Sequence, residues 1–180
     1  RVKKAPIPFT TSTLQQEASK VLNFSTQKTM RLAQQLYEGV EVKGKGTLGL
    51  ITYLRTDSVR ISDEADADAR AYIAQNYGEE FVATQTVTQK GGAKIQDAHE
   101  AIQAKKEGVK IQDAHEAIRP TDITLTPTIV KESLQRDLFR LYQLIWKRFT
   151  ASRMAPAVYE TTSVKIGAGS HLFTTSASKL

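Results

Sequence analysis

The ten residues ITYLRTDSVR, at positions 51 to 60, bring together side chains that could act on a phosphodiester. Tyr53 stands two places before Arg55, and a phenol attacks phosphorus well only when its proton is removed or its oxyanion is stabilised, because its unperturbed pKa is about 10. A guanidinium lowers that pKa and holds the phosphate oxygens whose charge grows in the transition state. The residues that follow the pair are Thr56, Asp57 and Ser58.

The residues TLGLITYL, at positions 47 to 54, are β-branched or apolar enough to predict an extended segment, with Tyr53 near its end. Residues two apart on an extended chain share a face, so the Tyr53 phenol and the Arg55 guanidinium could point into one cleft. A packed ring beside a solvated charge is the alternative, and the spacing alone leaves it open.

The word KIQDAHEAI occurs at residues 94 to 102 and again at 110 to 118, which predicts a local duplication rather than a repeat fold. Each copy carries a histidine followed by a glutamate. His99 and His115 are too far apart for a zinc site of the H-E-x-x-H kind, and there is no cysteine to assist. With Arg119 four residues on, His115 is better suited to contact phosphate, the alternative being a loop histidine bonded to backbone.

The acidic run DEADAD, residues 63 to 68, places Asp66 and Asp68 in a D-x-D spacing that can hold magnesium through oxygen ligands. On a helix these two residues point to different faces, so we predict a solvated acidic surface and no metal site. No glycine-rich phosphate loop followed by Lys and Ser or Thr occurs, so the sequence does not indicate ATP use.

Four helices are predicted to position these motifs, from apolar residues that recur every three or four places. They cover residues 11–24, 25–39, 63–78 and 133–154. Ser25 and Ser62 are suited to cap the second and third helices, and Gly39 to end the second. The last helix should be a main support of the core, because one face carries Leu134, Leu138, Leu141, Ile145 and Phe149.

Beyond Pro156 the pattern changes to near-alternation around a turn at residues 167–170, which predicts a β-hairpin or two edge strands. These strands have few apolar partners, so we expect them to complete a sheet that the chain only partly contains. The first six residues could join the same sheet. The fold class predicted is therefore mainly α, with short flanking β-strands.

The composition favours a polyanionic partner without naming one, since 25 Lys and Arg against 19 Asp and Glu give a formal charge of +6 and a pI of about 9.5. The absence of cysteine excludes disulfides and is consistent with a reducing compartment. No apolar run approaches the roughly 20 residues of a membrane span, and the first residues lack the apolar stretch of a signal peptide. We expect a cytoplasmic protein with no membrane partner, and a piece of something larger because the chain starts abruptly without Met.

Five words of the chain, taken in order, closely resemble the type IA DNA topoisomerases, the family that includes bacterial topoisomerase I. They are PFTTSTLQQEAS, KTMRLAQQLYEG, GLITYLRTDS, DAHEAIRPT and LYQLIWKRFTASRMAPA. The resemblance covers almost the whole chain and implies a fold, an activity and site residues.

The resemblance implies that Tyr53 is the nucleophile, which cleaves one strand of single-stranded DNA, forms a 5′-phosphotyrosyl link and leaves a free 3′-hydroxyl. Arg55 is implied as the cation that positions the scissile phosphate, with Asp57 as a supporting residue. His115 takes the role of the family's DNA-contacting histidine because only its copy of the repeated word continues as RPT, whereas His99 does not fit. The further DNA contacts expected are Arg119, Thr56 and Ser58.

In the whole enzyme, the resemblance implies passage of another strand and relaxation of negative supercoils without ATP. Magnesium ligands would lie on an acidic domain outside this chain, so no metal or other cofactor is expected here, and the isolated chain should be inactive. The expected partners are single-stranded DNA, negatively supercoiled duplex DNA and the remaining domains of the same monomeric enzyme, in the bacterial cytoplasm at the nucleoid. Residues 7–156 would form a winged-helix-like helical domain that carries the tyrosine, while residues 1–6 and 157–180 would belong to a β-rich hinge or arch domain.

Three alternatives come from other classes. One is a non-catalytic helical DNA-binding module whose third helix docks in a groove. Another is a tyrosine recombinase or type IB enzyme, which makes a 3′-linked adduct, but those sites gather several Arg and His around a tyrosine near the end of the catalytic domain, unlike ITYLRTDS. A helper that binds only other proteins is the third, and nothing in the sequence argues for it.

Overall fold

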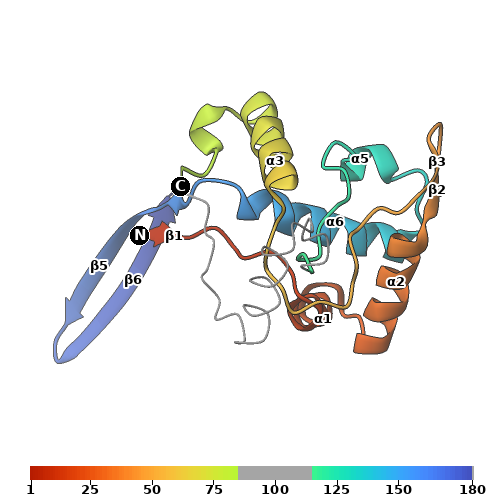
Figure 1. Cartoon of the computed structure of the whole chain (residues 1–180). Coiled ribbons are helices and arrows are strands. Elements are labelled where there is room, and N and C mark those ends of the chain that lie inside the picture. Colours follow the sequence, from red (N-terminus) through yellow and green to blue (C-terminus); the bar gives the residue numbers. More distant parts are fainter. Residues whose placement is uncertain (85–114, 180) are drawn as a thin grey trace, which may run out of the picture.

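The computed structural model describes residues 1–84 and 115–179. A helical body is built along the long helix α6 (Arg136–Ser152), and a β-hairpin projects from it (Figure 1). His99, the first copy of the repeated word and the start of the second lie outside the described residues. Within those residues, no helix is both long and apolar enough to cross a membrane.

The first predicted helix is confirmed as two joined pieces. The α-helix α1 (Thr11–Glu17) continues into a π-helical turn, η1 (Ala18–Leu22), and the chain leaves it at Asn23 in the left-handed conformation, with φ at 58°. Thr10 caps α1 with a reciprocal pair of hydrogen bonds: the Thr13 N–H donates to the Thr10 hydroxyl at 3.3 Å, and the Thr10 N–H donates to the Thr13 hydroxyl at 2.8 Å.

The second predicted helix is confirmed as α2 (Thr26–Glu38), capped by the Ser25 hydroxyl as expected. Gly39, with φ at 130°, ends it and leads into a small antiparallel pair, β2 (Val40–Val42) and β3 (Gly46–Leu48). The extended segment predicted over residues 47–54 is wrong beyond β3, where regular strand pairing stops. At the next residue, Gly49, an added Cβ would lie 2.7 Å from the Tyr37 carbonyl oxygen, so the chain bends where only glycine fits.

The third predicted helix is α3 (Asp63–Asn76), with the Ser62 hydroxyl accepting from the Ala65 N–H. It is followed by the short 3-10 turn η2 (Glu79–Phe81). The prediction of a solvated acidic surface is wrong for Asp66, whose side chain is 19% exposed, while Asp68 is exposed as expected.

The Asp66 carboxylate receives two guanidinium groups. Arg153, at the end of α6, donates to it at 2.8 Å, and Arg70, one turn along α3, donates at 2.6 Å. Arg70 also donates to the Ala83 carbonyl at 2.6 Å, and the Ala83 N–H donates to the Arg153 carbonyl at 3.0 Å. We call these four residues the Asp66 clamp, since they fasten α3 and the segment after η2 to the end of α6.

The last predicted helix is confirmed as α6, which begins at Arg136 rather than at Ser133 and is preceded by the single turn α5 (Pro127–Val130). All five residues predicted for its apolar face are buried, and they pack with α1, α2 and the irregular segments at residues 50–54 and 117–125 in one core. Two aromatic side chains of α6 anchor the second segment, because the Tyr142 hydroxyl donates to the Leu125 carbonyl and the Trp146 Nε1–H donates to the Ile123 carbonyl at 2.9 Å.

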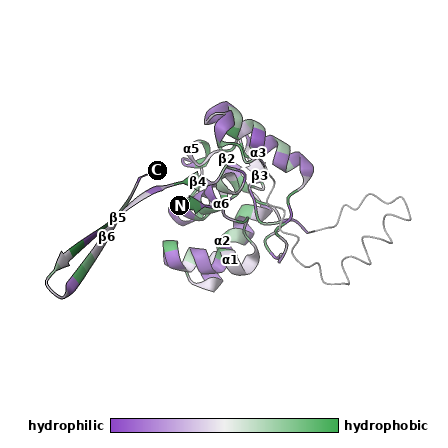
Figure 2. Cartoon of the chain, turned by 90° about the vertical axis from the view of Figure 1, so that its left-hand side faces the viewer, coloured by the Kyte–Doolittle hydropathy of each residue, from purple (hydrophilic) through white to green (hydrophobic). Residues whose placement is uncertain are grey.

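The predicted hairpin is confirmed as β5 (Glu160–Ala168) and β6 (His171–Lys179), with Gly169 in the left-handed turn at φ 60°. The first residues do not join it: β1 (Val2–Lys3) pairs instead with β4 (Ala157–Val158) in a separate two-stranded sheet. Every described hairpin residue is exposed, and Figure 2 shows the hairpin standing clear of the helices with apolar and polar residues along it. The mainly α class holds in outline, while the winged-helix detail and the domain division at residues 6 and 156 stay predictions.

Candidate active site

Tyr53 lies in a loop whose two ends are fixed by separate segments of the chain. On its N-terminal side, the Thr52 N–H donates to the Arg119 carbonyl at 2.9 Å, and the Thr52 hydroxyl donates to the Ala117 carbonyl at 2.8 Å. An isolated antiparallel bridge joins Ile51 to Pro120. The segment that begins with His115 therefore forms a floor under the start of the loop.

On its C-terminal side, the loop is fixed by one residue of α1. The Thr56 N–H donates to the Thr11 hydroxyl at 2.9 Å, and the Thr11 N–H returns a bond of 2.9 Å to the Thr56 carbonyl. The same Thr11 hydroxyl donates to the Leu54 carbonyl at 2.7 Å. Because the backbone is bonded on both sides of Tyr53, its position is set by the helical body rather than by a sheet.

Burial alternates along this loop although no strand forms. Leu54 and Thr56 are buried, whereas Tyr53, Arg55 and Asp57 are exposed. The phenol and the guanidinium thus both lie on the solvent side. That they point into one cleft stays a prediction, since Arg55 lines a hollow beside the loop and Tyr53 is not among the lining residues of that hollow.

The Tyr53 ring is held between two other rings. Tyr37, near the end of α2, meets it edge to face with centroids 5.4 Å apart and planes at 66°, and the His115 ring lies 6.3 Å away at 31°. The Tyr53 side chain is still 43% exposed, and its hydroxyl has no hydrogen-bond partner among residues 1–84 and 115–179. Sequence reasoning missed Tyr37, whose place in the word LAQQLYEG carried no chemical signal.

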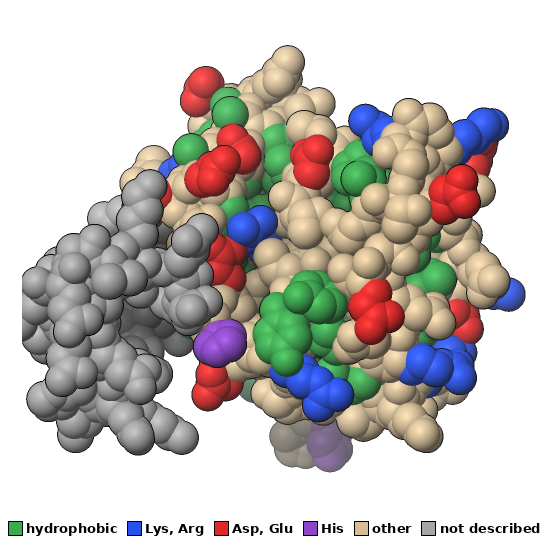
Figure 3. Space-filling view, turned by 45° about the vertical axis from the view of Figure 1, so that its right-hand side comes forward, with side chains coloured by type: hydrophobic (Ala, Val, Ile, Leu, Met, Phe, Trp, Pro, Cys, Tyr) green, Lys and Arg blue, Asp and Glu red, His purple; other side chains and the backbone are tan. Residues whose placement is uncertain are grey.

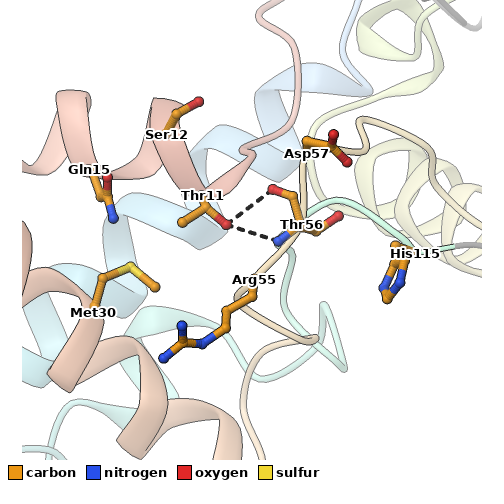
Figure 4. Close-up of a pocket in the computed structure, with 8 residues that line it drawn as sticks. All are labelled: Thr11, Ser12, Gln15, Met30, Arg55, Thr56, Asp57 and His115. Atoms are coloured by element: carbon orange, nitrogen blue, oxygen red, sulfur yellow. Dashed lines mark hydrogen bonds between the residues drawn. The ribbon is translucent and has the colours of Figure 1, made fainter. Parts of the chain in front are cut away.

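An open hollow of about 620 Å³ lies beside this loop (Figure 4). The Arg55 side chain runs across it toward Met30 and away from His115. The Arg55 guanidinium has no hydrogen bond or ion pair with any residue that the structure describes, so it is available to an incoming anion. The lining residues are Thr11, Ser12, Gln15, Met30, Arg55, Thr56, Asp57 and His115.

Arg119, the second cation predicted to contact DNA, is turned inward. Its guanidinium forms an ion pair with Glu116 at 2.7 Å and donates to the Pro120 carbonyl at 3.0 Å, and only 14% of its side chain is exposed. A phosphate contact by Arg119 stays a prediction, and it would require these bonds to break.

The hydroxyl residues predicted to contact DNA are engaged with nearby backbone. The Ser58 N–H donates to the Thr56 hydroxyl and the Arg60 N–H donates to the Ser58 hydroxyl, each at 3.1 Å. These bonds shape the turn after Arg55. The roles of Thr56 and Ser58 in DNA binding stay predictions.

The described residues around Tyr53 do not form a magnesium-binding site. In the described part of the chain no three His, Asp or Glu side chains gather as metal ligands, and Asp57 is the one carboxylate that lines the hollow. The face shown in Figure 3 carries acidic and basic side chains in mixture, without a broad basic patch. Anion binding here would rest on Arg55 and His115 rather than on a general positive field.

Comparisons with known proteins give two matches for the chain. Residues 1–180 match the model of a protein family described as DNA topoisomerase. Among solved structures, the chain is similar to the full-length topoisomerase I from Thermotoga maritima, with 42% sequence identity and a TM-score of 0.76. The match covers 99% of this chain and 26% of that one, so the chain spans about a quarter of the length of that enzyme.

Proposed function

The chain belongs to the DNA topoisomerase family, and from this premise we propose that it is the strand-cleaving part of a type IA enzyme with Tyr53 as nucleophile. The observation that carries the proposal is the exposed Tyr53 phenol, held between Tyr37 and His115 two residues before Arg55, whose guanidinium has no partner among residues 1–84 and 115–179. A solvent-accessible phenol on the same side of the loop as a cation can meet a phosphodiester whose oxygens that cation binds.

The proposed cleavage is a transesterification. The Tyr53 phenolic oxygen bonds to phosphorus as it loses its proton, the bond from phosphorus to the 3′-oxygen breaks, and that oxygen takes up a proton to become a free hydroxyl. Arg55 donates to the non-bridging oxygens as their charge grows. Resealing is the same step in reverse, because a phenolate on phosphate is a fair leaving group, so no ATP is consumed.

We propose that proton transfer and magnesium are supplied from outside this chain. The proposal is supported by the hollow, where Asp57 is the one lining carboxylate, and by residues 1–84 and 115–179, where no three potential metal ligands gather. When bound, magnesium would neutralise phosphate charge. The isolated chain should then bind single-stranded DNA weakly and in a salt-sensitive way, without relaxing supercoils.

Passage of a second DNA strand requires the cleaved strand to open. We propose that the helical residues 7–156 move as one winged-helix-like body to open it, and that the outer strands belong to a β-rich hinge. The projecting hairpin supports this division, since β5 and β6 are exposed on both faces while α6 is buried at the centre of the body. The soluble enzyme would act on negatively supercoiled DNA as a monomer at the bacterial nucleoid.

The alternative of a helical module that docks its third helix in a DNA groove is disfavoured by charge. The solvent face of α3 carries Asp63, Glu64 and Asp68, all exposed. Phosphates on either side of a groove would repel these carboxylates.

The proposal is tested by the polarity of the covalent adduct. We would insert this chain in place of the matching segment of the Thermotoga maritima enzyme and trap the complex on single-stranded oligonucleotides labelled at either end. A 5′-phosphotyrosyl link retains the 3′-end label on the protein and releases the 5′-end label. Retention of the 5′-end label instead would identify the 3′-linked chemistry of a type IB enzyme or recombinase.

Replacing Arg55 with alanine should slow adduct formation by that chimera about tenfold to a hundredfold. Arg55 is the arginine that lines the hollow, and its guanidinium can stabilise the phosphate in the transition state, although water competes at an exposed site. Single-turnover cleavage of a short oligonucleotide measures the rate. Arg55→Lys should recover part of it, and equal rates for the alanine variant and the parent would remove Arg55 from the mechanism.

Replacing Tyr37 with alanine should slow the same step about threefold to tenfold, the equivalent of one aromatic pair. Its ring edge is what fixes the Tyr53 ring, so Tyr37→Phe should retain the parent rate. Oligonucleotide affinity, measured by anisotropy, should change little in either variant. A loss with phenylalanine as large as that with alanine would mean that the Tyr37 hydroxyl, and not its ring, matters.

A further inference from the structure

The hollow beside Tyr53 is larger than a scissile phosphate requires, and the proposed chemistry uses only part of its lining. Arg55 and His115 suit a phosphate. The wall on the other side comes from α1 and α2 and presents Ser12, Gln15 and Met30 (Figure 4). None of these three residues has a part in cleavage.

Two of these wall residues, Gln15 and Met30, are available to contact a ligand, whereas the Ser12 hydroxyl shares a hydrogen bond with Thr10 at 3.2 Å. The Gln15 amide is partly buried yet has no hydrogen bond to any residue within 1–84 or 115–179. Met30 is partly buried and packs against the core, so its polarizable thioether is placed to make the favourable contact that sulfur makes with flat rings. An amide beside such a thioether matches the edge and the face of a nucleobase.

The volume of the hollow and the charges that line it limit which ligands it can bind. About 620 Å³ is within the roughly 300–1,000 Å³ of small-molecule sites, and so is large enough for one nucleotide. The Asp57 carboxylate lies on the same side as His115 and would repel a second phosphate. The lining therefore suits one phosphate at Arg55 with one sugar and base beyond it, and does not suit a run of backbone phosphates.

We propose that this hollow seats the first nucleotide on the 3′ side of the cleavage point, the one whose 5′-phosphate Tyr53 would carry. Its phosphate lies at the Arg55 guanidinium, and its base lies on Met30 with the Gln15 amide at its edge. The inference rests on the proposed function, because only a 5′-linked intermediate leaves that nucleotide tethered beside the hollow. Seating it would keep the broken end in place until resealing.

The two methionines of the chain provide the test, since Met30 lines the hollow and Met154 does not. Carbon-13 methyl labelling of methionine gives one NMR signal for each. On addition of the 5′-phosphorylated dithymidylate pTpT, the Met30 signal should shift and saturate, while the Met154 signal stays in place. The same ligand with an abasic first nucleotide should bind about tenfold more weakly, which is the usual effect of losing one stacked base.

Single-residue variants then test which residues of the hollow contact the ligand. Gln15→Ala should weaken binding of pTpT about threefold, whereas Gln16→Ala, its exposed neighbour on α1 outside the hollow, should leave it unchanged. Arg55→Ala should weaken binding about tenfold. Inorganic phosphate alone should leave the Met30 signal in place, and unchanged backbone amide spectra would show that each variant is folded.

The outcomes separate this inference from the proposed function. Three outcomes would contradict the proposed nucleotide site even if the chimera forms its adduct. They are an unmoved Met30 signal, equal shifts of both methionine signals, and equal affinity for the abasic and the intact ligand. A chimera that forms no Tyr53 adduct would overturn the proposed function. The Met30 shift itself does not depend on the phenolic oxygen, so a Tyr53→Phe chain should reproduce it.

Discussion

Replacing Tyr53 with phenylalanine should abolish both the covalent DNA adduct and relaxation in a chimera that carries this chain. Every other part of the site remains, because the ring keeps its contacts with Tyr37 and His115 and only the attacking oxygen is lost. The expected loss exceeds about 10⁴-fold, since in the proposed reaction the Tyr53 oxygen is the atom that attacks phosphorus. Adduct formation on a labelled oligonucleotide and relaxation of a supercoiled plasmid measure it.

A matched control is available in the contacting ring. Tyr37→Phe removes the same atom from a phenol 5.4 Å away and should leave cleavage nearly intact. DNA affinity should be the same in both variants, because an exposed hydroxyl contributes little to binding. Residual adduct in Tyr53→Phe that disappears in Tyr37→Phe would place the nucleophile on α2 and contradict the assignment.

The helices could be predicted because their signals are local. The apolar stripe of α6 and the serine caps of α2 and α3 each depend on residues within a few turns of one another, and all were found in the structure. The end of β3 before Tyr53 could not be predicted, because it follows from the close approach of Gly49 to the Tyr37 carbonyl, a contact between separate segments. Burial still alternates in the loop after β3, because Leu54 and Thr56 pack inward while Arg55, which lies between them, faces solvent.

The site was predictable in its residue types but not in its arrangement. Tyr53 and Arg55 could be named from their spacing and from the family resemblance, whereas Tyr37 joins them only through the packing of α2. The inward turn of Arg119 had a local signal, the Glu116 three residues before it on the same segment. Long-range packing decides which cations near Tyr53 remain free.

The Asp66 clamp is the strongest case of a feature hidden from sequence, since Asp66 and Arg153 are 87 residues apart. Burial by itself would raise the pKa of Asp66. The hydrogen bonds from Arg153 and then Arg70 outweigh burial and hold that pKa below its ordinary value of 3.8. The clamp also fixes where α6 ends, because the Ala83 N–H bonds to the Arg153 carbonyl just before the chain leaves for β4.

Replacing Asp66 with asparagine should therefore lower the free energy of unfolding of this chain by about 3–5 kcal/mol, the usual cost of removing one partner from a buried ion pair. The Arg153 side chain is only 5% exposed and would keep its charge with no carboxylate to meet it. Urea denaturation at neutral pH measures the change. Asp68→Asn is the control, because that carboxylate is exposed on the same helix and its loss should cost less than about 0.5 kcal/mol.

The pH dependence of the free energy of unfolding tests the same ion pair. Since the pKa of Asp66 is lower in the folded chain than in the unfolded one, its contribution is complete above the ordinary value of 3.8 and is lost as pH falls through the folded pKa. The gap between the parent and Asp66→Asn should stay constant from about pH 5 to 7, begin to narrow below about pH 4, and close only as pH falls through the lower folded pKa, where the carboxyl of the folded chain becomes protonated. A gap that persists unchanged into strong acid would mean that asparagine destabilises the fold through its shape. In that case the charge of Asp66 would not be what holds α3 to the end of α6.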